Sequence, residues 1–167
     1  GDSEAPAAFE PEKDTLPPRP GGLVTVLSQL DMSKRLSKTD YKKKMRKYQG
    51  ELHLLQRKAM KKGVSSIIVF EGMDAAGKGG AIRRTVAPLD PRIYRIVPIA
   101  ATTDEERAQH YLWRFWRHMS RAGHITIYDR SWYGRVLVER IEGFASRDEW
   151  QRAYAEINDF EKRLADH

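Results

Sequence analysis

The stretch that most constrains the fold of this chain is a glycine-rich loop at residues 70–82, FEGMDAAGKGGAI. Gly72, Gly77 and Lys78 match the pattern G-x-x-x-x-G-K, and the apolar run IIVF precedes them at residues 67–70. A buried strand, a glycine turn and a helix, in this order, direct backbone N–H groups and the positive end of a helix dipole toward one anion. The stretch therefore predicts a phosphate-binding loop in an α/β fold. The alternative is a strand-to-helix turn that is glycine-rich but binds nothing.

One position in the loop departs from the pattern of nucleotide triphosphatases. Gly79 stands where a serine or threonine hydroxyl normally helps to hold Mg²⁺. Another oxygen ligand is then needed, and the Asp74 carboxylate, inside the loop, is the nearest candidate for this hard cation.

The rest of the pattern predicts strands that alternate with helices. Strands are expected at residues 67–70, 93–97 and 124–128. Helices are expected from near Lys78 to the stop at Pro88, from the capping box at Thr103 to about Arg121, and from a second capping box at Ser146. This alternation is typical of a parallel α/β sheet with right-handed crossovers.

A second carboxylate is expected at the same edge of that sheet. Asp129 ends the third predicted strand, where open parallel sheets bind ligands and where phosphate-loop enzymes hold Mg²⁺. Arg130 and Arg135 follow closely, and guanidinium groups suit multidentate phosphate contacts. The alternative is an Asp and Arg pair that only ties down the strand end.

The net charge of +7 is concentrated in one segment. Residues 41–62 contain nine Lys or Arg against one Glu. The same segment carries six apolar residues at helical spacing: Tyr41, Met45, Tyr48, Leu52, Leu55 and Ala59. This spacing predicts a basic helix with one apolar face, which packs on the sheet or on a second copy of itself. The basic face either attracts a polyanion or is an ordinary solvated surface.

Composition and sequence order suggest the setting and the domain layout. There is no cysteine, which excludes disulfides and thiolate metal sites. The absence of cysteine agrees with a cytoplasmic location, which is predicted, and no signal peptide and no membrane-crossing apolar run is evident. Residues 1–37 begin with a proline-rich run and are expected to be a linker or extended arm, with the domain at 38–167.

Four motifs together resemble the family-2 polyphosphate kinases over residues 38–167: GMDAAGKGGAIRR, LDPRIYRIVPI, TTDEERAQHYLWRFWRHMSRAG and YDRSWYGRVLVERIEGF. The resemblance implies a thymidylate-kinase-like, P-loop kinase-like α/β/α sandwich whose glycine loop is its Walker A motif. It implies Mg²⁺-dependent transfer of a phosphoryl group between inorganic polyphosphate and a nucleoside mono- or diphosphate, AMP or ADP. It also implies a partial second domain of a tandem-domain member, truncated before its lid and last strands.

The same resemblance implies roles for individual residues. Asp74 and Asp129 would bind the metal and act in catalysis, while Lys78 and Arg130 would contact the transferred phosphate. The phosphate-binding residues expected from the loop, the guanidinium groups and the resemblance are Gly72, Ala75, Ala76, Gly77, Lys78, Gly79, Gly80, Arg83, Arg84 and Arg135.

Two other functions stay open from the sequence. One is an ATP-dependent nucleotide or small-molecule kinase of the same fold. The other is a catalytically silent partner domain that binds polyanions through the basic helix. The expected partners are inorganic polyphosphate and a nucleotide (AMP, ADP or ATP), with homo-oligomer or tandem-domain pairing, and with neither a membrane nor nucleic acid as the main partner.

Overall fold

The computed structural model describes residues 30, 31 and 33–166. Every described helix and strand belongs to one compact unit that begins at Lys38. The proline-rich arm expected at residues 1–37 lies almost wholly outside the described residues, so the domain layout stays a prediction.

The unit is built on three parallel strands in the order β1-β3-β2: β1 (Ser66–Phe70), β3 (Ile125–Asp129) and β2 (Tyr94–Pro98). In this register Asp129, at the end of the central strand, lies opposite Phe70 on one side and Pro98 on the other. Each strand lies within one residue of its predicted position. The parallel α/β sheet is therefore confirmed.

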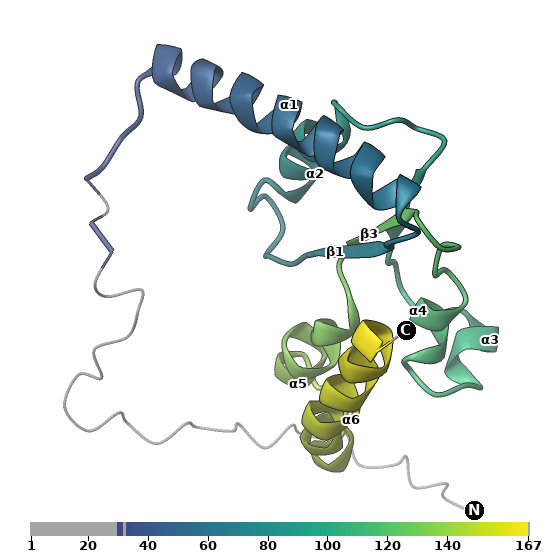
Figure 1. The fold of residues 1–167 in the computed structure, drawn as a ribbon. Helices are drawn as coiled ribbons and strands as arrows, with labels where there is room; N and C mark the ends of the chain where they lie inside the picture. Colours follow the sequence, from purple (N-terminus) through teal and green to yellow (C-terminus); the bar gives the residue numbers. More distant parts are fainter. Residues whose placement is uncertain (1–29, 32, 167) are drawn as a thin grey trace, which may run out of the picture. The chain divides into compact units, whose positions relative to one another are not determined.

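Alternating side chains of β3 build a separate core on each face of the sheet. Ile125 and Ile127 pack with Ile82 of α2 (Lys78–Val86), while Tyr128 packs with Ile157 and other residues of α6 (Arg147–Asp166) and neighbouring segments. In Figure 1, α1 and α2 accordingly lie on one side of the strands and α5 and α6 on the other. The result is the predicted α/β/α layering.

The first helix, α1 (Lys38–Lys61), forms as expected, and Met45, Leu52 and Ala59 of the predicted apolar face are half-buried, but the packed face is rotated toward Gln49 and Gln56. Tyr48 and Leu55 of the predicted apolar face are more than half exposed. Gln49 Nε2 instead donates to Arg84 O (2.9 Å), and Gln56 Oε1 accepts from Asp90 N (3.0 Å). Gln49 thus supplies a donor to a carbonyl in the last turn of α2, which lacks an intrahelical partner, and Gln56 supplies an acceptor to an amide in the segment after α2.

The single helix predicted from Thr103 to about Arg121 is wrong. The Thr103 capping box forms, but α3 (Asp104–Arg107) and α4 (Trp113–Trp116) are short and separate. Arg114 is almost buried and pairs with Glu106 (3.2 Å), and it also donates to Ala100 O (2.9 Å). A straight helix would hold positions 106 and 114 roughly 12 Å apart along its axis. The chain therefore folds back between α3 and α4, which lets the nearly buried Arg114 pair with Glu106.

The segment after β3 leads to the last helix through η2 (Trp132–Val136) and α5 (Val138–Ile141). At the start of α6, Ser146 N donates to Glu149 Oε2 (2.8 Å) and Glu149 N donates to Ser146 Oγ (3.4 Å), so the second capping box is confirmed. Among the described residues, no helix combines the length and apolar character needed to cross a membrane.

Candidate phosphate-binding site

An open pocket of about 390 Å³ lies at the carboxyl ends of the three strands. Its walls come from the glycine loop after β1 and α2's first residues, and from the last residue of β2 and of β3 with the residue that follows each. The lining residues are Asp74, Ala75, Gly77, Lys78, Gly79, Pro98, Ile99, Asp129 and Arg130. A parallel sheet gathers these segments because all its strands end at the same edge.

The loop that forms one wall depends on glycine at two positions. Gly77, just before α2, has φ 91°, and Gly72, just after β1, has φ 154°. A Cβ at Gly72 would also lie 3.2 Å from the Ala76 Cβ. No side chain caps the N-terminus of α2. The loop thus directs an uncapped, positive helix end into the pocket, which suits an anion.

Lys78 opens α2 and its ammonium group is folded back over the loop. Nζ donates to Gly72 O at 2.9 Å and to Met73 O at 3.2 Å. Among the described residues these two carbonyls are its hydrogen-bond partners, and no carboxylate forms an ion pair with it. The ammonium group is therefore available to an anion in the pocket.

Asp129 supplies a buried acceptor. Its Oδ1 atom accepts no hydrogen bond from any described residue. An unpaired buried carboxylate oxygen is costly unless a ligand or a cation engages it. The position in the pocket wall makes this oxygen available to such a partner.

Asp74 and Arg130 face each other across the pocket and form an ion pair. The Asp74 side chain is 89% exposed and that of Arg130 is 43% exposed. An exposed pair of this kind contributes little to stability. A ligand can therefore separate the two side chains and pair with either of them at a small cost in free energy.

The backbone of this pocket is strained at two places. Ala75 (φ 64°) and Arg130 (φ 69°) are the non-glycine residues with positive φ among those described, and both line the pocket. Such residues cost about 1–3 kcal/mol each and persist where neighbouring contacts fix them. Arg130 N donates to Phe70 O (2.9 Å), which ties it to β1.

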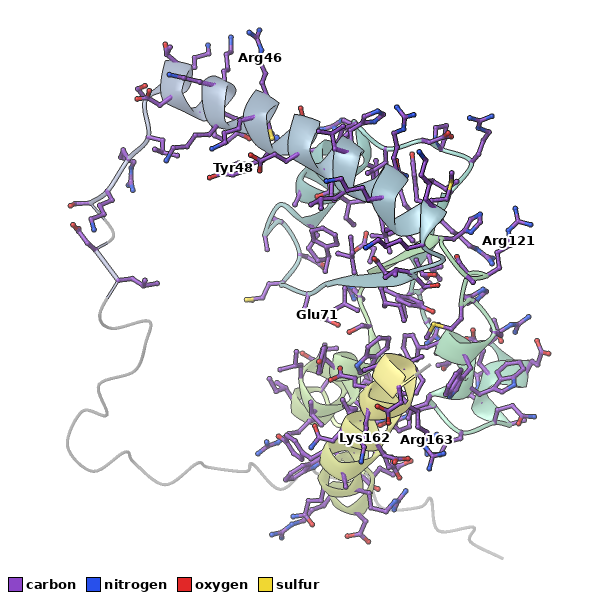
Figure 2. The ribbon with its side chains drawn as sticks, in the orientation of Figure 1. Arg46, Tyr48, Glu71, Arg121, Lys162 and Arg163 are labelled. Atoms are coloured by element: carbon purple, nitrogen blue, oxygen red, sulfur yellow. The ribbon has the colours of Figure 1, made fainter. Side chains whose placement is uncertain are left out.

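Glu71 fixes the same turn from the loop side. Its Oε1 atom accepts from Ser131 N at 2.7 Å and from Ser131 Oγ at 2.6 Å. Figure 2 shows Glu71 extending from the end of β1 toward the segment after β3. Glu71 therefore links the start of the loop to the turn that carries Asp129 and Arg130.

The structure brings all four residues proposed as catalytic, Asp74, Lys78, Asp129 and Arg130, to one pocket. Of the other predicted phosphate-binding residues, Ala75, Gly77 and Gly79 line it, whereas Gly72, Ala76 and Gly80 belong to the loop and helix behind it. Arg83 is exposed on α2 and does not line the pocket.

Arg84 and Arg135 also lie outside the pocket. Arg84 lines a neighbouring groove between α1 and α2. The half-buried Arg135 pairs with Glu139 at 3.2 Å and lies 4.4 Å from the centre of the Tyr111 ring. These contacts place Arg135 in the packing around η2.

Three residues around the site were not anticipated. Pro98 and Ile99 line the pocket, and Glu71 supports it. The first two follow a predicted strand, so the rule that ligands bind at strand ends could have indicated them. No signal in the sequence pairs Glu71 with Ser131, because 60 positions separate them.

The fold and the site define the P-loop kinase-like class of α/β proteins. Its features here are a parallel sheet, a glycine loop, a lysine that opens the next helix and an aspartate that ends the neighbouring strand. The family model described as polyphosphate kinase 2 matches residues 35–167. The chain belongs to the polyphosphate kinase 2 family, which confirms the resemblance noted in its motifs.

Individual relatives agree with this assignment. The chain is 59% identical over 142 residues to the polyphosphate:AMP phosphotransferase of Pseudomonas syringae pv. tomato and 57% identical to that of Pseudomonas aeruginosa. These alignments cover 85% of this chain but 28% and 29% of the relatives. The crystal structure of polyphosphate kinase 2 from Arthrobacter aurescens TC1 superposes with a TM-score of 0.78 at 33% identity, covering 87% of this chain and 55% of that one.

Proposed function

We propose that this chain carries the phosphate-binding part of a site that transfers a phosphoryl group between inorganic polyphosphate and a nucleotide. The single observation that carries the proposal is the convergence of the loop, Lys78, Arg130 and the unpaired Asp129 oxygen on one pocket. In-line transfer needs mainly positioning and neutralisation of phosphate charge, which these groups can supply without a covalent intermediate.

Each residue has a distinct part in this proposal. Lys78 releases the loop carbonyls and binds oxygens of the transferred phosphoryl group. In the transition state the negative charge of that group is spread over these oxygens. Arg130 exchanges Asp74 for a phosphate group, and its guanidinium donates two parallel N–H bonds to two of the phosphate oxygens. Arg83 and Arg84, farther along α2, are proposed to attract the rest of the polyphosphate chain.

Mg²⁺ is the cofactor that the donor set fits best. The described residues contain no cluster of three or more metal-ligating side chains, but Mg²⁺ needs only one or two carboxylates together with water and substrate phosphates. The unpaired Asp129 oxygen meets this need, and Asp74 is the second carboxylate of the pocket. When bound, the cation would supply charge neutralisation between the phosphate oxygens.

AMP is the acceptor that we propose first. Both relatives at 57–59% identity carry the name polyphosphate:AMP phosphotransferase, and the sequence alone left AMP and ADP open. We further propose that the protein acts in the cytoplasm, where nucleotides are available. We also propose that it pairs with a second domain or a second copy.

The test uses the 167-residue chain with Mg²⁺, with polyphosphate or ATP as the sole donor and AMP or ADP as the acceptor, measured separately. We expect AMP to be phosphorylated with polyphosphate as donor. Turnover with ATP alone would support an ATP-dependent kinase instead. Turnover of neither donor, with polyphosphate still bound, would support a silent binding domain.

Replacing Lys78 by Ala should lower kcat roughly 10²–10³-fold, because a charge directed at the transferred phosphate is lost. The matched control is Lys62→Ala, an exposed lysine just after α1, which should leave kcat unchanged. Retained turnover in Lys78→Ala would remove this lysine from the mechanism.

A further inference from the structure

Two aromatic side chains that follow the pocket turn in sequence share one hydrogen-bond acceptor. Trp132 Nε1 donates to Glu161 Oε1 at 2.8 Å, and the Tyr133 hydroxyl donates to the same oxygen. Trp132 and Tyr133 begin η2, whereas Glu161 lies in the second half of α6. One carboxylate oxygen therefore joins α6 to the residues just behind the phosphate pocket.

The indole of Trp132 depends on this acceptor. Its ring is 3% exposed and packs against the rings of Phe115, Tyr128 and Phe160. A buried indole N–H needs an acceptor, because it has lost its hydrogen bond to water. Among the described residues, Glu161 supplies that acceptor. Without the carboxylate, the indole would gain by moving to a position where its N–H can reach another acceptor or water.

The hydroxyl of Tyr133 lies near two carboxylates. The hydrogen bond to Glu161, together with burial, raises the pKa of Tyr133 above its ordinary value of 10.0, and the charge of Glu71 raises it further. The hydroxyl therefore stays protonated, and stays a donor, at neutral pH. Glu71 is also the acceptor of both hydrogen bonds from Ser131. Residues 131–133 are thus held by Glu71 from the loop side and by Glu161 from the α6 side.

This double attachment matters because Arg130, the preceding residue, is strained. Its φ of 69° persists only where contacts on both sides fix the backbone. On one side Arg130 N donates to Phe70 O at 2.9 Å. On the other side the fixed points are the residues that Glu71 and Glu161 hold. A shift of these residues would redirect the guanidinium group of Arg130 and the carboxylate of Asp129.

We propose that Glu161 is a positioning residue for phosphoryl transfer, which fixes the turn that presents Asp129 and Arg130 to the phosphate by holding Trp132 and Tyr133. Glu161 itself does not line the pocket. The inference rests on the proposed function for the identity of the reaction. The glycine loop and its lysine do not depend on Glu161, so its loss should lower kcat more than it raises KM for polyphosphate.

The test compares Glu161→Ala with Glu161→Gln, whose amide oxygen can accept both hydrogen bonds. Tyr133→Phe is a milder variant, because it removes one of the two bonds and leaves Glu161 in place. Asp159→Ala removes an exposed carboxylate from the same helix, and Ser146→Ala weakens the start of that helix without touching the turn. These two variants control for lost charge and for lowered stability.

Three quantities are measured on the 167-residue chain and its variants. The first is kcat and KM with Mg²⁺, polyphosphate and AMP. The second is the affinity for tripolyphosphate, by calorimetric titration. The third is the indole N–H signal of Trp132 in the ¹H–¹⁵N spectrum, which Trp132→Phe identifies.

We expect Glu161→Ala to lower kcat about 10–100-fold, since small displacements of catalytic groups have effects of this size. Its Trp132 signal should move upfield as the hydrogen bond is lost. Glu161→Gln should restore most of the kcat and of the signal position, and Tyr133→Phe should have an intermediate kcat. Asp159→Ala and Ser146→Ala should keep the kcat and the Trp132 signal of the parent.

Unchanged kcat in Glu161→Ala, or an equal loss in Ser146→Ala, would overturn the inference. If Glu161→Ala does not fold, Tyr133→Phe decides, and parental kcat in that variant would overturn it. If the parent itself shows no turnover, the proposed function fails and the titration decides. Weaker binding of tripolyphosphate by Glu161→Ala than by Ser146→Ala would then support the positioning role, and equal binding would contradict it.

Discussion

At the scale of single residues, the candidate site depends on two turns held in strained conformations. Ala75 and Arg130 both have positive φ, and both line the pocket. The hydrogen bonds from Ser131 to Glu71 and from Arg130 N to Phe70 O hold the second turn. Glu71, which does not line the pocket, therefore helps to hold the turn that carries Arg130.

Replacing Glu71 by Ala should lower the free energy of unfolding by roughly 1–2 kcal/mol, because two donors of Ser131 lose their acceptor. It should also weaken binding of tripolyphosphate, since Arg130 is released. Urea denaturation and calorimetric titration measure the two effects. Glu71→Gln keeps an acceptor oxygen and should restore most of both.

The control for Glu71→Ala is Glu142→Ala, at an exposed position after α5. It should change neither stability nor binding. If Glu71→Ala and Glu142→Ala behave alike, the link between Glu71 and Ser131 does not position the site.

Tyr128 predicts an alkaline limit to stability. Burial raises the pKa of its hydroxyl from 10.0 to about 12, and the hydroxyl donates to Phe115 O at 2.7 Å. Because the folded-state pKa is raised, the stability contributed by the neutral hydroxyl is complete below pH 10 and is lost as the pH rises to about 12.

Tyr128→Phe should cost roughly 1 kcal/mol at pH 7, through the lost hydrogen bond. The difference in Tm between the two proteins should narrow between pH 10 and pH 12, since phenylalanine cannot ionise. Thermal unfolding followed by circular dichroism across this range measures it. A constant difference up to pH 12 would show that ionisation of Tyr128 does not limit stability.

At the scale of elements, α6 illustrates how a local signal and a tertiary contact combine. The capping box of Ser146 and Glu149 satisfies backbone donors at its start, and Ala153, Ile157 and Phe160 are the buried positions along it. The hydrogen bond from the Ser146 backbone, and next the one from the Ser146 side chain, also lower the pKa of the Glu149 carboxyl. The helix begins where local chemistry directs it, and its buried face is set by the sheet.

Ser146→Ala should destabilise the protein by roughly 0.5–2 kcal/mol, because the Glu149 amide loses its cap. Urea denaturation measures the change. Asn158→Ala, at an exposed position inside the same helix, should be neutral or slightly stabilising because alanine has the higher helix propensity. A neutral Ser146→Ala would mean that the box forms without contributing to stability.

At the scale of the whole compact unit, one aromatic cluster joins the central strand to the last helix. The rings of Phe160 in α6 and Trp132 pack edge to face with their centres 4.9 Å apart, and the ring centres of Trp132 and Tyr128 in β3 are 5.7 Å apart. Asp129 and Arg130 lie between Tyr128 and Trp132 in sequence. The core therefore anchors both sides of the turn that enters the pocket.

Phe160→Ala should cost about 3–5 kcal/mol, since the ring is 3% exposed and its removal leaves a cavity. The control is Tyr154→Ala on the same helix, where the ring is 50% exposed and the expected change is below about 1 kcal/mol. Chemical denaturation of both variants provides the comparison. Similar costs for both would mean that the cluster is not a tightly packed core.

Local chemistry in the sequence by itself determined the strands, the glycine loop, the two capping boxes and the parallel sheet. Gly72, Gly77 and Lys78 are close in sequence, and Asp129 was placed by the rule that ligands bind at strand ends. Such features could be predicted because each depends on neighbouring residues or on a general property of parallel sheets.

Only the tertiary structure decided which surfaces meet. Arg114 pairs with Glu106 where α3 and α4 are separate helices, and the hydrogen bond that Gln49 donates and the one that Gln56 accepts rotate the packed face of α1 from the predicted one. Glu71 reaches Ser131 across 60 positions. Buried charges and unpaired backbone groups select these partners after the chain has folded back on itself, and periodicity along the sequence does not record that choice.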